Sequence, residues 1–559
     1  MKKLILCSSL ILLSACGKRN IELDVKGVIP DQEHTKVINT VAYMFDNYFV
    51  HDKGVDGSAE VRKINNTFAK ELFYNKIEEV FFRQKDFHTQ FIKPTKCFSV
   101  GVHIKNLSFD IADENGRKKI VVSSLNSSKD SHNIINSNNF SAYYDALAQL
   151  QVGDVITEIN DVNVLQALKN IEPISFGANK DAKQLSAVNY LLYRDGAIHS
   201  FPNEVEYILT IEREQKKITI PTIVFSKVGC ENDKQGNSLF SDNSEEERPK
   251  KPSLDFLKNA YHPMAEIENE EDKKYEFKVE ENFTYLKIPT FSLKSNKDYK
   301  KQVDTILFDI DTKLSNPKID TIVIDVRNNG GGFAGYSDNL AKLFYDKKSK
   351  YPFYPMEFRL KNTKGNKELV NKFLAYGMNE FRNIESEYKL WQKDLEEATQ
   401  KGKTYTEPRA ITQDFELIET YSSNFTKANG KNIIVLTNAK CYSACDLFVA
   451  IMKDQNLATK IVGETKLTGG GGANVLRWKD LVERNFVDKL PDNTDLSFAW
   501  RDMHSRVKNG TAHRKIEGKG TQVDCVIPKT IADIKEKTES LNSNYIQKVI
   551  SAVLEDRCK

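Results

Sequence analysis

The chain has 559 residues, of which 40% are hydrophobic and 28% carry a charge, and its formal net charge is only +3. This length and apolar content predict two or three folded domains and exclude general disorder. The near-neutral charge gives no reason to expect a nucleic acid or an acidic membrane surface as a partner, because both need a concentrated basic surface.

The N-terminus has the pattern of an export signal. Lys2 and Lys3 precede an apolar run, Leu4–Leu13, that is too short for a membrane-spanning helix. The run ends in small residues and Cys16, which resembles a bacterial lipobox, in which the signal is cut before the cysteine and its thiol receives lipid. Gly17 follows, which favours the outer membrane by resemblance to sorting in enteric bacteria. We expect a membrane-anchored lipoprotein of the bacterial cell envelope, facing the periplasm or the cell surface. An ordinary secretory signal with a chance cysteine is the alternative.

The later cysteines indicate disulfides rather than a metal site. Their number is even, and an oxidising compartment permits pairing, although the pairs cannot be read from sequence. They are Cys97, Cys230, Cys441, Cys445, Cys525 and Cys558. No Cys-x-x-Cys pair or His/Cys cluster has zinc spacing, so we expect neither a metal nor an organic cofactor.

Two segments make up the part of the chain between the export signal and residue 228. Residues 20–95 read as a helical domain, because apolar residues recur at helical spacing. Residues 96–228 read as β-rich, with a polar helical insertion at Lys180–Arg194. Within them Leu150–Asp161, a Gly-Asp turn feeding a strand, resembles the heart of a PDZ domain. PDZ domains pair an extended peptide with a sheet edge, and a ligand-free β-barrel is the alternative.

After a charged linker at 229–275, strands alternate with helices, which predicts an α/β layer with parallel strands over 276–533. A long polar insertion interrupts it at 347–425, and 534–559 read as a closing C-terminal helix. The predicted strands are Phe283–Ile288, Asp320–Val326, Lys431–Thr437 and Thr459–Val462, and the predicted helices are Asp298–Leu314, Asp446–Lys453 and one starting at Leu340–Tyr345.

Two strand ends carry residues suited to chemistry. Gly330, Gly331 and Gly332 follow the second predicted strand, and glycines there let backbone N–H groups approach a negative charge. Such a loop can hold an oxyanion or a phosphate, or can be a ligand-free turn, but the P-loop ending and the GxGxxG pattern are missing. Ser443 lies between the third predicted strand and a helix, where the Ala444 N–H could stabilise an oxyanion. A simple helix cap is the alternative for this serine.

Together, in this order and spacing, the two strand ends resemble the tail-specific, or C-terminal-processing, serine peptidases. Residues 323–332 resemble the oxyanion segment of that family, and 443–446 its nucleophile turn, where Ser-Ala-Ser-Glu is more usual. Residues 463–465 and 517–528 resemble its later signatures. The resemblance implies a crotonase-like α/β peptidase domain, a polypeptide substrate and a serine nucleophile at 443. It also implies an oxyanion hole formed by Ala444 with Gly330 or Gly331.

The proton acceptor departs from the commonest pattern of the family. Many members use a Ser-Lys dyad, but the lysine position falls at or near Gly469, and Lys466 lies three residues early. The branch resembling the tricorn core protease and chlamydial protease-like activity factor uses a distant His and a Glu. The resemblance therefore implies His88 as the base, which a histidine suits at neutral pH, and Glu517 as its supporting acid. The alternatives for these two roles are Lys466, His504 and His513 for the base, and Asp86, Asp446 and Glu464 for the acid.

Two rival functions remain open. The chain could be a catalytically inactive lipoprotein that binds peptides or apolar ligands on the same fold, or an envelope scaffold that docks through the insertion at 347–425. The pattern does not indicate an oligomeric state.

Overall fold

The structure is a computed structural model, and it describes residues 31–50, 54–93, 100–101, 106–126, 140–194, 198–199, 206–222, 224–225, 275–293, 299–314, 320–346, 348–380, 382–410, 431–491, 494–536 and 544–558. The predicted export signal with Cys16, and the predicted linker up to residue 274, lie outside these residues. Among the helices within these ranges, none is both long enough and apolar enough to cross a membrane.

The catalytic region is built on a six-stranded sheet with the order β10-β11-β12-β15-β16-β20. Neighbours from β11 to β20 are parallel, and β10 pairs with β11 as an antiparallel edge strand. The strands are β10 (Glu276–Val279), β11 (Thr284–Lys287), β12 (Thr321–Asp325), β15 (Asn432–Thr437), β16 (Lys460–Gly463) and β20 (Cys525–Val526). All residues of β12 are buried, as expected for a parallel sheet covered on both faces.

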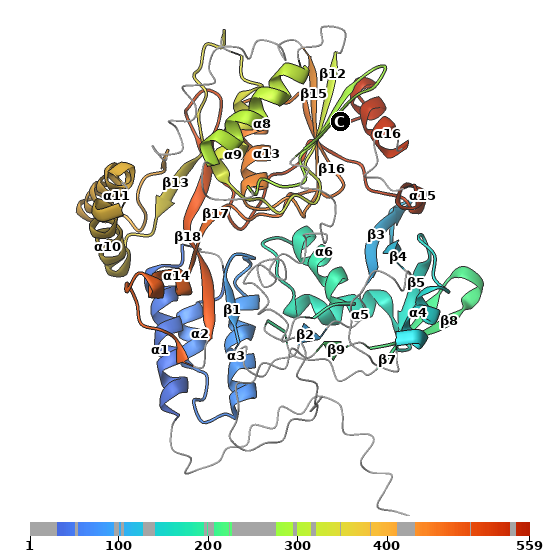
Figure 1. Cartoon of the computed structure of the whole chain (residues 1–559), viewed down its shortest axis with the longest axis horizontal. Helices are drawn as coiled ribbons and strands as arrows, with labels where there is room; N and C mark the ends of the chain where they lie inside the picture. The colour runs from blue at the N-terminus through green and yellow to red at the C-terminus, as the bar shows by residue number, and fades with distance from the viewer. Residues whose placement is uncertain are drawn as a thin grey trace, which may run out of the picture.

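Helices cover both faces of this sheet (Figure 1). Alternate residues of β12 join different hydrophobic clusters, because successive side chains of a strand point to opposite faces. Ile322 and Ile324 pack in the cluster of α8, α9 and α13, whereas Val323 packs in that of α16. These helices are α8 (Tyr299–Leu314), α9 (Ala334–Lys342), α13 (Ala444–Asp454) and α16 (Asn544–Leu554).

The N-terminal helices pack against a second sheet that contains the long strand β18. That sheet has the order β1-β18-β13-β14, with β17 and β19 also paired to β18. Residues of α1, α3, β18 and the parallel sheet form one continuous hydrophobic cluster, so the N-terminal helices share a core with the catalytic region. The elements are α1 (Gln32–Asn47), α2 (Gly57–Arg62), α3 (Lys70–Phe82), β1 (Gln90–Ile92), β13 (Glu357–Leu360), β14 (Arg409–Ala410), β17 (Ala473–Arg477), α14 (Trp478–Glu483), β18 (Asp495–Arg506) and β19 (His513–Lys515).

The β-rich part forms an antiparallel sheet, β3-β4-β5-β7-β8, with β6 paired to β5 and its own hydrophobic cluster. The predicted helical insertion is helix α6. The edge strand β3 contacts the C-terminal region, where the N–H of Asp113 donates to the carbonyl of Lys529. The elements are β2 (Val100–Gly101), β3 (Leu107–Glu114), β4 (Arg117–Leu125), α4 (Phe140–Leu147), β5 (Val155–Ile159), β6 (Val162–Asn163), α5 (Val164–Ile171), η2 (Glu172–Ile174), α6 (Lys180–Tyr190), β7 (Glu206–Ile211), η3 (Arg213–Gln215), β8 (Lys217–Pro221) and β9 (Val224–Phe225).

The polar insertion at 347–425 has regular structure over its described residues. It contains β13, a helical hairpin of α10 (Lys364–Glu380) and α11 (Arg382–Gln400), and β14. The hairpin projects from the side of the molecule beside β13 (Figure 1). Trp391 of α11 is fully buried and donates to Glu387, and Arg409 lies over its ring. Because charged residues cover this buried aromatic side chain, the sequence of the insertion has a polar pattern.

Two helix boundaries differ from the sequence expectation. Helix α9 begins at Ala334 and ends at Lys342, where we expected a helix to start, because it follows the glycine loop directly with Phe333 as its N-cap. The expected single helix at 534–559 is two helices, α15 (Ile531–Lys535) and α16. Thr530 and Asp533 form a reciprocal capping box that starts α15 before the expected position.

Candidate active site

Ser443 lies at the turn between β15 and α13, at the carboxyl end of the parallel strands. It is the N-cap residue of α13, yet its side chain makes no capping hydrogen bond. Its φ of +57° and ψ of −123° are rare for a residue with a side chain. Ser443 is half-buried between buried neighbours. These features disfavour the helix-cap alternative.

The glycine loop after β12 lies directly against this turn. A Cβ added to Gly331 would lie 2.6 Å from the Ser443 Cβ and 2.6 Å from the Tyr442 carbonyl oxygen. Gly331 also has a φ of +102°, a conformation that favours glycine. The glycine is therefore required for the two strand ends to meet.

The same loop corrects one predicted oxyanion donor. The N–H of Gly331 donates to Asn329 Oδ1 at 2.8 Å, so that group is already occupied. Gly330, the other predicted donor, is half-buried beside it. Ala444 is the first residue of α13, where an N–H has no partner within its helix. Gly330 and Ala444 therefore remain the candidates for an oxyanion hole.

His88 comes to this site from between α3 and β1. Its backbone N–H donates to Asp86 Oδ1 at 2.8 Å, and its carbonyl accepts from Ser497 Oγ of β18 at 2.7 Å. The His88 Nδ1 lies 3.8 Å from Asp86 Oδ1. The segment is thus fixed against β18, far along the chain, with the imidazole beside a buried carboxylate.

Tyr442 connects His88 to the nucleophile turn. Its ring centroid lies 4.7 Å from that of His88, and its hydroxyl donates to Asp86 Oδ1 at 3.1 Å. The same hydroxyl accepts from the N–H of Phe87 at 2.8 Å. Burial, with the charge of Asp86 adding to it, raises the pKa of Tyr442 well above its ordinary value. Tyr442, directly before Ser443, therefore keeps a neutral hydroxyl, which is hydrogen-bonded to the segment that carries His88.

Glu517 completes a cluster with Asp86 and His88. One ligating atom from each of the three side chains lies within 4.8 Å of the others. Glu517 is fully buried, and burial, followed by the charge of Asp86, raises its pKa well above the ordinary range. The spacing could also suit a metal ion, but Asp86 already accepts hydrogen bonds from Tyr442 and Thr89. Burial and the neighbouring charge of Asp86 therefore favour the neutral form of the Glu517 carboxyl.

A run of four glycines, 469–472, packs around the nucleophile turn. A Cβ on Gly471 would lie 2.1 Å from the Tyr442 ring, and one on Gly472 would lie 2.6 Å from the Glu517 nitrogen. Asp446 of α13 accepts from the N–H groups of Gly470 and Gly471 at 2.7 and 2.8 Å. Burial raises the pKa of Asp446 to about 7, although these hydrogen bonds oppose the shift. The run therefore joins the helix after Ser443 to the segment of Glu517.

The alternative bases have other partners. Lys466 is exposed, and its backbone N–H donates to Asp181 of α6 at 3.1 Å. His504 lies 3.2 Å from Asp502, and His513 lies 2.6 Å from Glu357. Among the predicted candidates, the structure thus places His88 against the nucleophile turn and gives Lys466, His504 and His513 other surroundings.

A buried charge network braces the strand ends behind the site. Arg327, two residues after the end of β12, contacts Asp325 at 2.7 Å and Glu464 at 2.8 Å. Lys529 lies 3.4 Å from Glu464 and 2.5 Å from Asp110 of β3. Burial opposes ionisation of Glu464, but Lys529 and Arg327 lower its pKa to about 2. The network ties the β-rich sheet to the strand ends that carry the site.

Replacing Glu464 with glutamine should destabilise the protein strongly. The change leaves two buried cations short of one counter-charge, which typically costs about 3–5 kcal/mol. Glu483, which faces Lys479 at 3.7 Å on the surface, is the matched control, and Glu483→Gln should cost less than about 1 kcal/mol. Urea unfolding of both variants measures the difference, and equal losses would show that the network adds nothing.

Two disulfides pair four of the six later cysteines, whereas Cys97 and Cys230 lie outside the described residues. Cys441 pairs with Cys445, on either side of Ser443, and Cys525 of β20 pairs with Cys558. The site features that sequence reasoning missed are this first disulfide and the role of Tyr442. The sequence offers Asp86 only as an alternative to Glu517 for the acid, although the Asp-x-His spacing in 86–88 is a usable signal.

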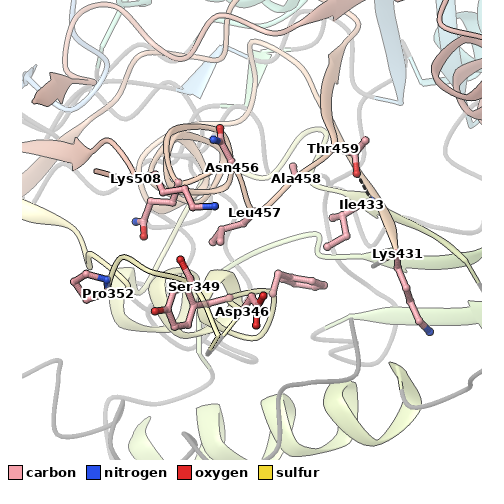
Figure 2. A pocket seen from close by; sticks show the side chains of 13 residues that line it. Asp346, Ser349, Pro352, Lys431, Ile433, Asn456, Leu457, Ala458, Thr459 and Lys508 are labelled. Carbon is pink, nitrogen blue, oxygen red and sulfur yellow. Dashed lines mark hydrogen bonds between the residues drawn. The ribbon is translucent and has the colours of Figure 1, made fainter. Parts of the chain in front are cut away.

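A cavity of about 310 Å³ lies at the amino ends of the parallel strands, opposite the ends that carry the nucleophile turn. It is lined near the start of β15 and by residues between α13 and β16, among them Lys431, Asn456 and Thr459 (Figure 2). The nucleophile turn is at the far ends of these strands. The cavity is therefore separate from the cluster around Ser443.

Three features together define a serine hydrolase. They are a serine at a strand-to-helix turn of a parallel sheet, a glycine loop against that turn, and a buried cluster of a histidine with carboxyl groups. Residues 282–481 match the family model described as peptidase family S41. The chain therefore carries a peptidase domain of that family and is a serine-type peptidase, which confirms the resemblance found in its motifs. No curated protein sequence matches the chain.

Solved structures of one protease share the fold over almost the whole chain. They are mature CPAF (TM-score 0.61, 15% identity, covering 94% of this chain and 98% of that chain), mature CPAF complexed with lactacystin (0.60, 14%, 94% and 99%) and a CPAF s499a mutant (0.55, 15%, 94% and 97%). At these identities the likeness establishes the fold, and it confirms the predicted α/β peptidase architecture with helical and β-rich parts.

Proposed function

We propose that the protein is a serine endopeptidase in which Ser443 is the nucleophile and His88 the general base. The observation that carries this proposal is the position of Tyr442. Its ring contacts His88 and its hydroxyl binds Asp86, while its backbone leads directly into Ser443. Tyr442 thus connects two segments that lie more than 350 residues apart in the sequence.

The reaction follows from these groups. The Ser443 Oγ attacks the scissile carbonyl carbon as its proton passes to the His88 imidazole. The tetrahedral oxyanion accepts hydrogen bonds from the N–H groups of Gly330 and Ala444, and one such donor typically lowers the barrier by about 2.7–4 kcal/mol. The C–N bond then breaks, and the leaving amine takes the proton from His88. Water, deprotonated by His88, hydrolyses the Ser443 ester and restores the hydroxyl.

The two buried carboxyl groups have different tasks in this scheme. Asp86 fixes the His88 segment through its backbone N–H and through the Tyr442 hydroxyl. Glu517, whose pKa is raised by burial and by Asp86, shares a proton with the imidazole and supports the imidazolium form. A base held by an orienting acid is the arrangement that serine hydrolases use on many folds.

We also propose the setting in which the enzyme works. The lipobox-like pattern ending at Cys16 favours an enzyme anchored by lipid in the cell envelope, where it cleaves exported polypeptides. The PDZ-like pattern of Leu150–Asp161 favours a β-rich domain that positions a substrate end or gates the groove. Because the edge of β3 already contacts Lys529, gating is the reading that we favour.

A form starting at Gly17, offered casein and a serine-reactive fluorophosphonate, tests the proposal. We expect hydrolysis that is insensitive to metal chelators, together with stoichiometric labelling. A folded protein that neither hydrolyses casein nor reacts with the probe would contradict it, and tight peptide binding by that protein would favour a non-catalytic ligand-binding lipoprotein.

Tyr442→Phe should lower kcat about tenfold with little change in KM. The variant keeps the ring against His88 but removes the hydroxyl that binds Asp86 and Phe87, and leaving such buried groups unpaired costs about 1–3 kcal/mol. Tyr336→Phe is the matched control, since Tyr336 is fully buried and its hydroxyl has no hydrogen-bond partner among the described residues. Equal kcat values for the two variants would show that the Tyr442 hydroxyl does not contribute to catalysis.

A further inference from the structure

The disulfide between Cys441 and Cys445 encloses the proposed nucleophile. The two cysteines are four positions apart, and Ser443 is the central residue of the loop that their bond closes. Both cysteine side chains are fully buried, whereas Ser443 is half-buried. The loop is thus anchored in the core on both sides and open at its tip.

The backbone of Ser443 has a conformation that needs support. Its φ of +57° with ψ of −123° lies outside the regions that residues with a side chain favour, and such conformations persist only where the surroundings hold them. Released from its surroundings, the turn would relax to a more common conformation, and the hydroxyl would turn away from the imidazole and the oxyanion donors.

Backbone hydrogen bonds fix mainly the flanks of the turn. The N–H of Tyr442 donates to Asn329, and the carbonyl of Cys441 accepts from Gly469. On the helix side, the N–H of Cys445 donates to Tyr442 and the N–H of Leu447 to Ser443. The disulfide is the covalent connection that spans Ser443 from one flank to the other.

We propose that the Cys441–Cys445 disulfide is a positioning element for Ser443, so that full peptidase activity requires this pair of cysteines to be oxidised. The inference rests on the proposed function, since it concerns the same nucleophile. It adds a redox condition to that site: the enzyme would gain activity in an oxidising compartment and stay weakly active where its thiols are reduced.

The redox step is an ordinary thiol–disulfide exchange. A dithiol gives two electrons and two protons to the pair, which becomes two thiols, and the dithiol becomes a cyclic disulfide. Because Cys441 and Cys445 are buried, the exchange needs the loop to open, and we expect reduction of the native protein to be slow. A substrate analogue in the active site should slow it further.

The second disulfide supplies a matched control. Cys525 and Cys558 join β20 to the C-terminal end, and they pack in a different hydrophobic cluster from Cys441 and Cys445. The test compares two double variants. The nucleophile-loop variant carries Cys441→Ser and Cys445→Ser together, and the control variant carries Cys525→Ser and Cys558→Ser together. Each full-chain variant is assayed well below its own Tm for kcat, KM and the rate of fluorophosphonate labelling.

We expect the nucleophile-loop variant to lose at least tenfold in kcat and in labelling rate with KM within twofold of wild type. The control variant should unfold at a lower temperature yet keep kcat within twofold. Equal labelling of the wild type and the nucleophile-loop variant would overturn the inference and leave the proposed function standing. A wild type that neither labels nor hydrolyses would overturn both.

Reversible reduction decides the matter if the nucleophile-loop variant does not fold. In the Cys525→Ser, Cys558→Ser background, dithiothreitol should release the Cys441 and Cys445 thiols, identified by alkylation and mass spectrometry, and lower kcat at least tenfold. Reoxidation should restore it. Reduced protein with both thiols alkylatable and an unchanged kcat would contradict the proposal.

Discussion

Ser443→Ala will abolish peptide hydrolysis while leaving the protein folded. Loss of an activated serine removes the covalent route, and we expect kcat to fall by about 10⁴-fold or more, with a residue of activity from the oxyanion donors and substrate binding. The substitution removes a half-buried hydroxyl that makes no capping hydrogen bond, so Tm should change little. Casein hydrolysis and thermal unfolding measure the two effects.

Ser349→Ala is the control for this experiment. Ser349 lines the separate cavity at the amino ends of the parallel strands (Figure 2), and we expect that variant to retain wild-type kcat. An alanine variant at 443 that keeps more than a tenth of the wild-type kcat would assign the nucleophile to another residue.

His88→Gln will produce the second large effect. Without a proton acceptor the serine hydroxyl is a weak nucleophile at neutral pH, and general-base catalysis typically contributes about 10²–10⁴-fold. We therefore expect kcat to fall by that factor, with KM nearly unchanged. Steady-state kinetics on a fluorogenic peptide measures both parameters.

Lys466→Ala distinguishes the two possible bases. Because the Lys466 side chain is exposed and its backbone is bound to Asp181, this variant should keep kcat within twofold of wild type. Full activity in His88→Gln together with a large loss in Lys466→Ala would restore the Ser-Lys dyad.

Local patterns in the sequence predicted the parts of the site that depend on local structure. Asp320–Val326 and Lys431–Thr437 read as buried strands and correspond to β12 and β15. The glycines and the serine that follow them could be assigned to neighbouring strand ends, because parallel strands end at the same edge. A serine in a turn and a helix-capping serine look alike in sequence, and the backbone of Ser443 was needed to separate them.

Contacts between distant segments could not be predicted in this way. Tyr442 binds Asp86 across 356 positions, and nothing in the residues around either one indicates the other. The loss of Gly331 as an oxyanion donor depends on an Asn329 side chain that turns back onto its own loop. The cysteine pairing also depends on the fold, since the sequence allows several pairings and the described residues show Cys441 with Cys445 and Cys525 with Cys558.

Locating the covalent adduct is the most direct test of the serine-hydrolase mechanism. The wild-type protein is labelled with a fluorophosphonate, digested and analysed by mass spectrometry, with His88→Gln labelled in parallel. We predict a single adduct on the peptide that contains Ser443, formed far more slowly in the variant. An adduct on any other residue, or labelling of Ser443 at the same rate without His88, would contradict the mechanism.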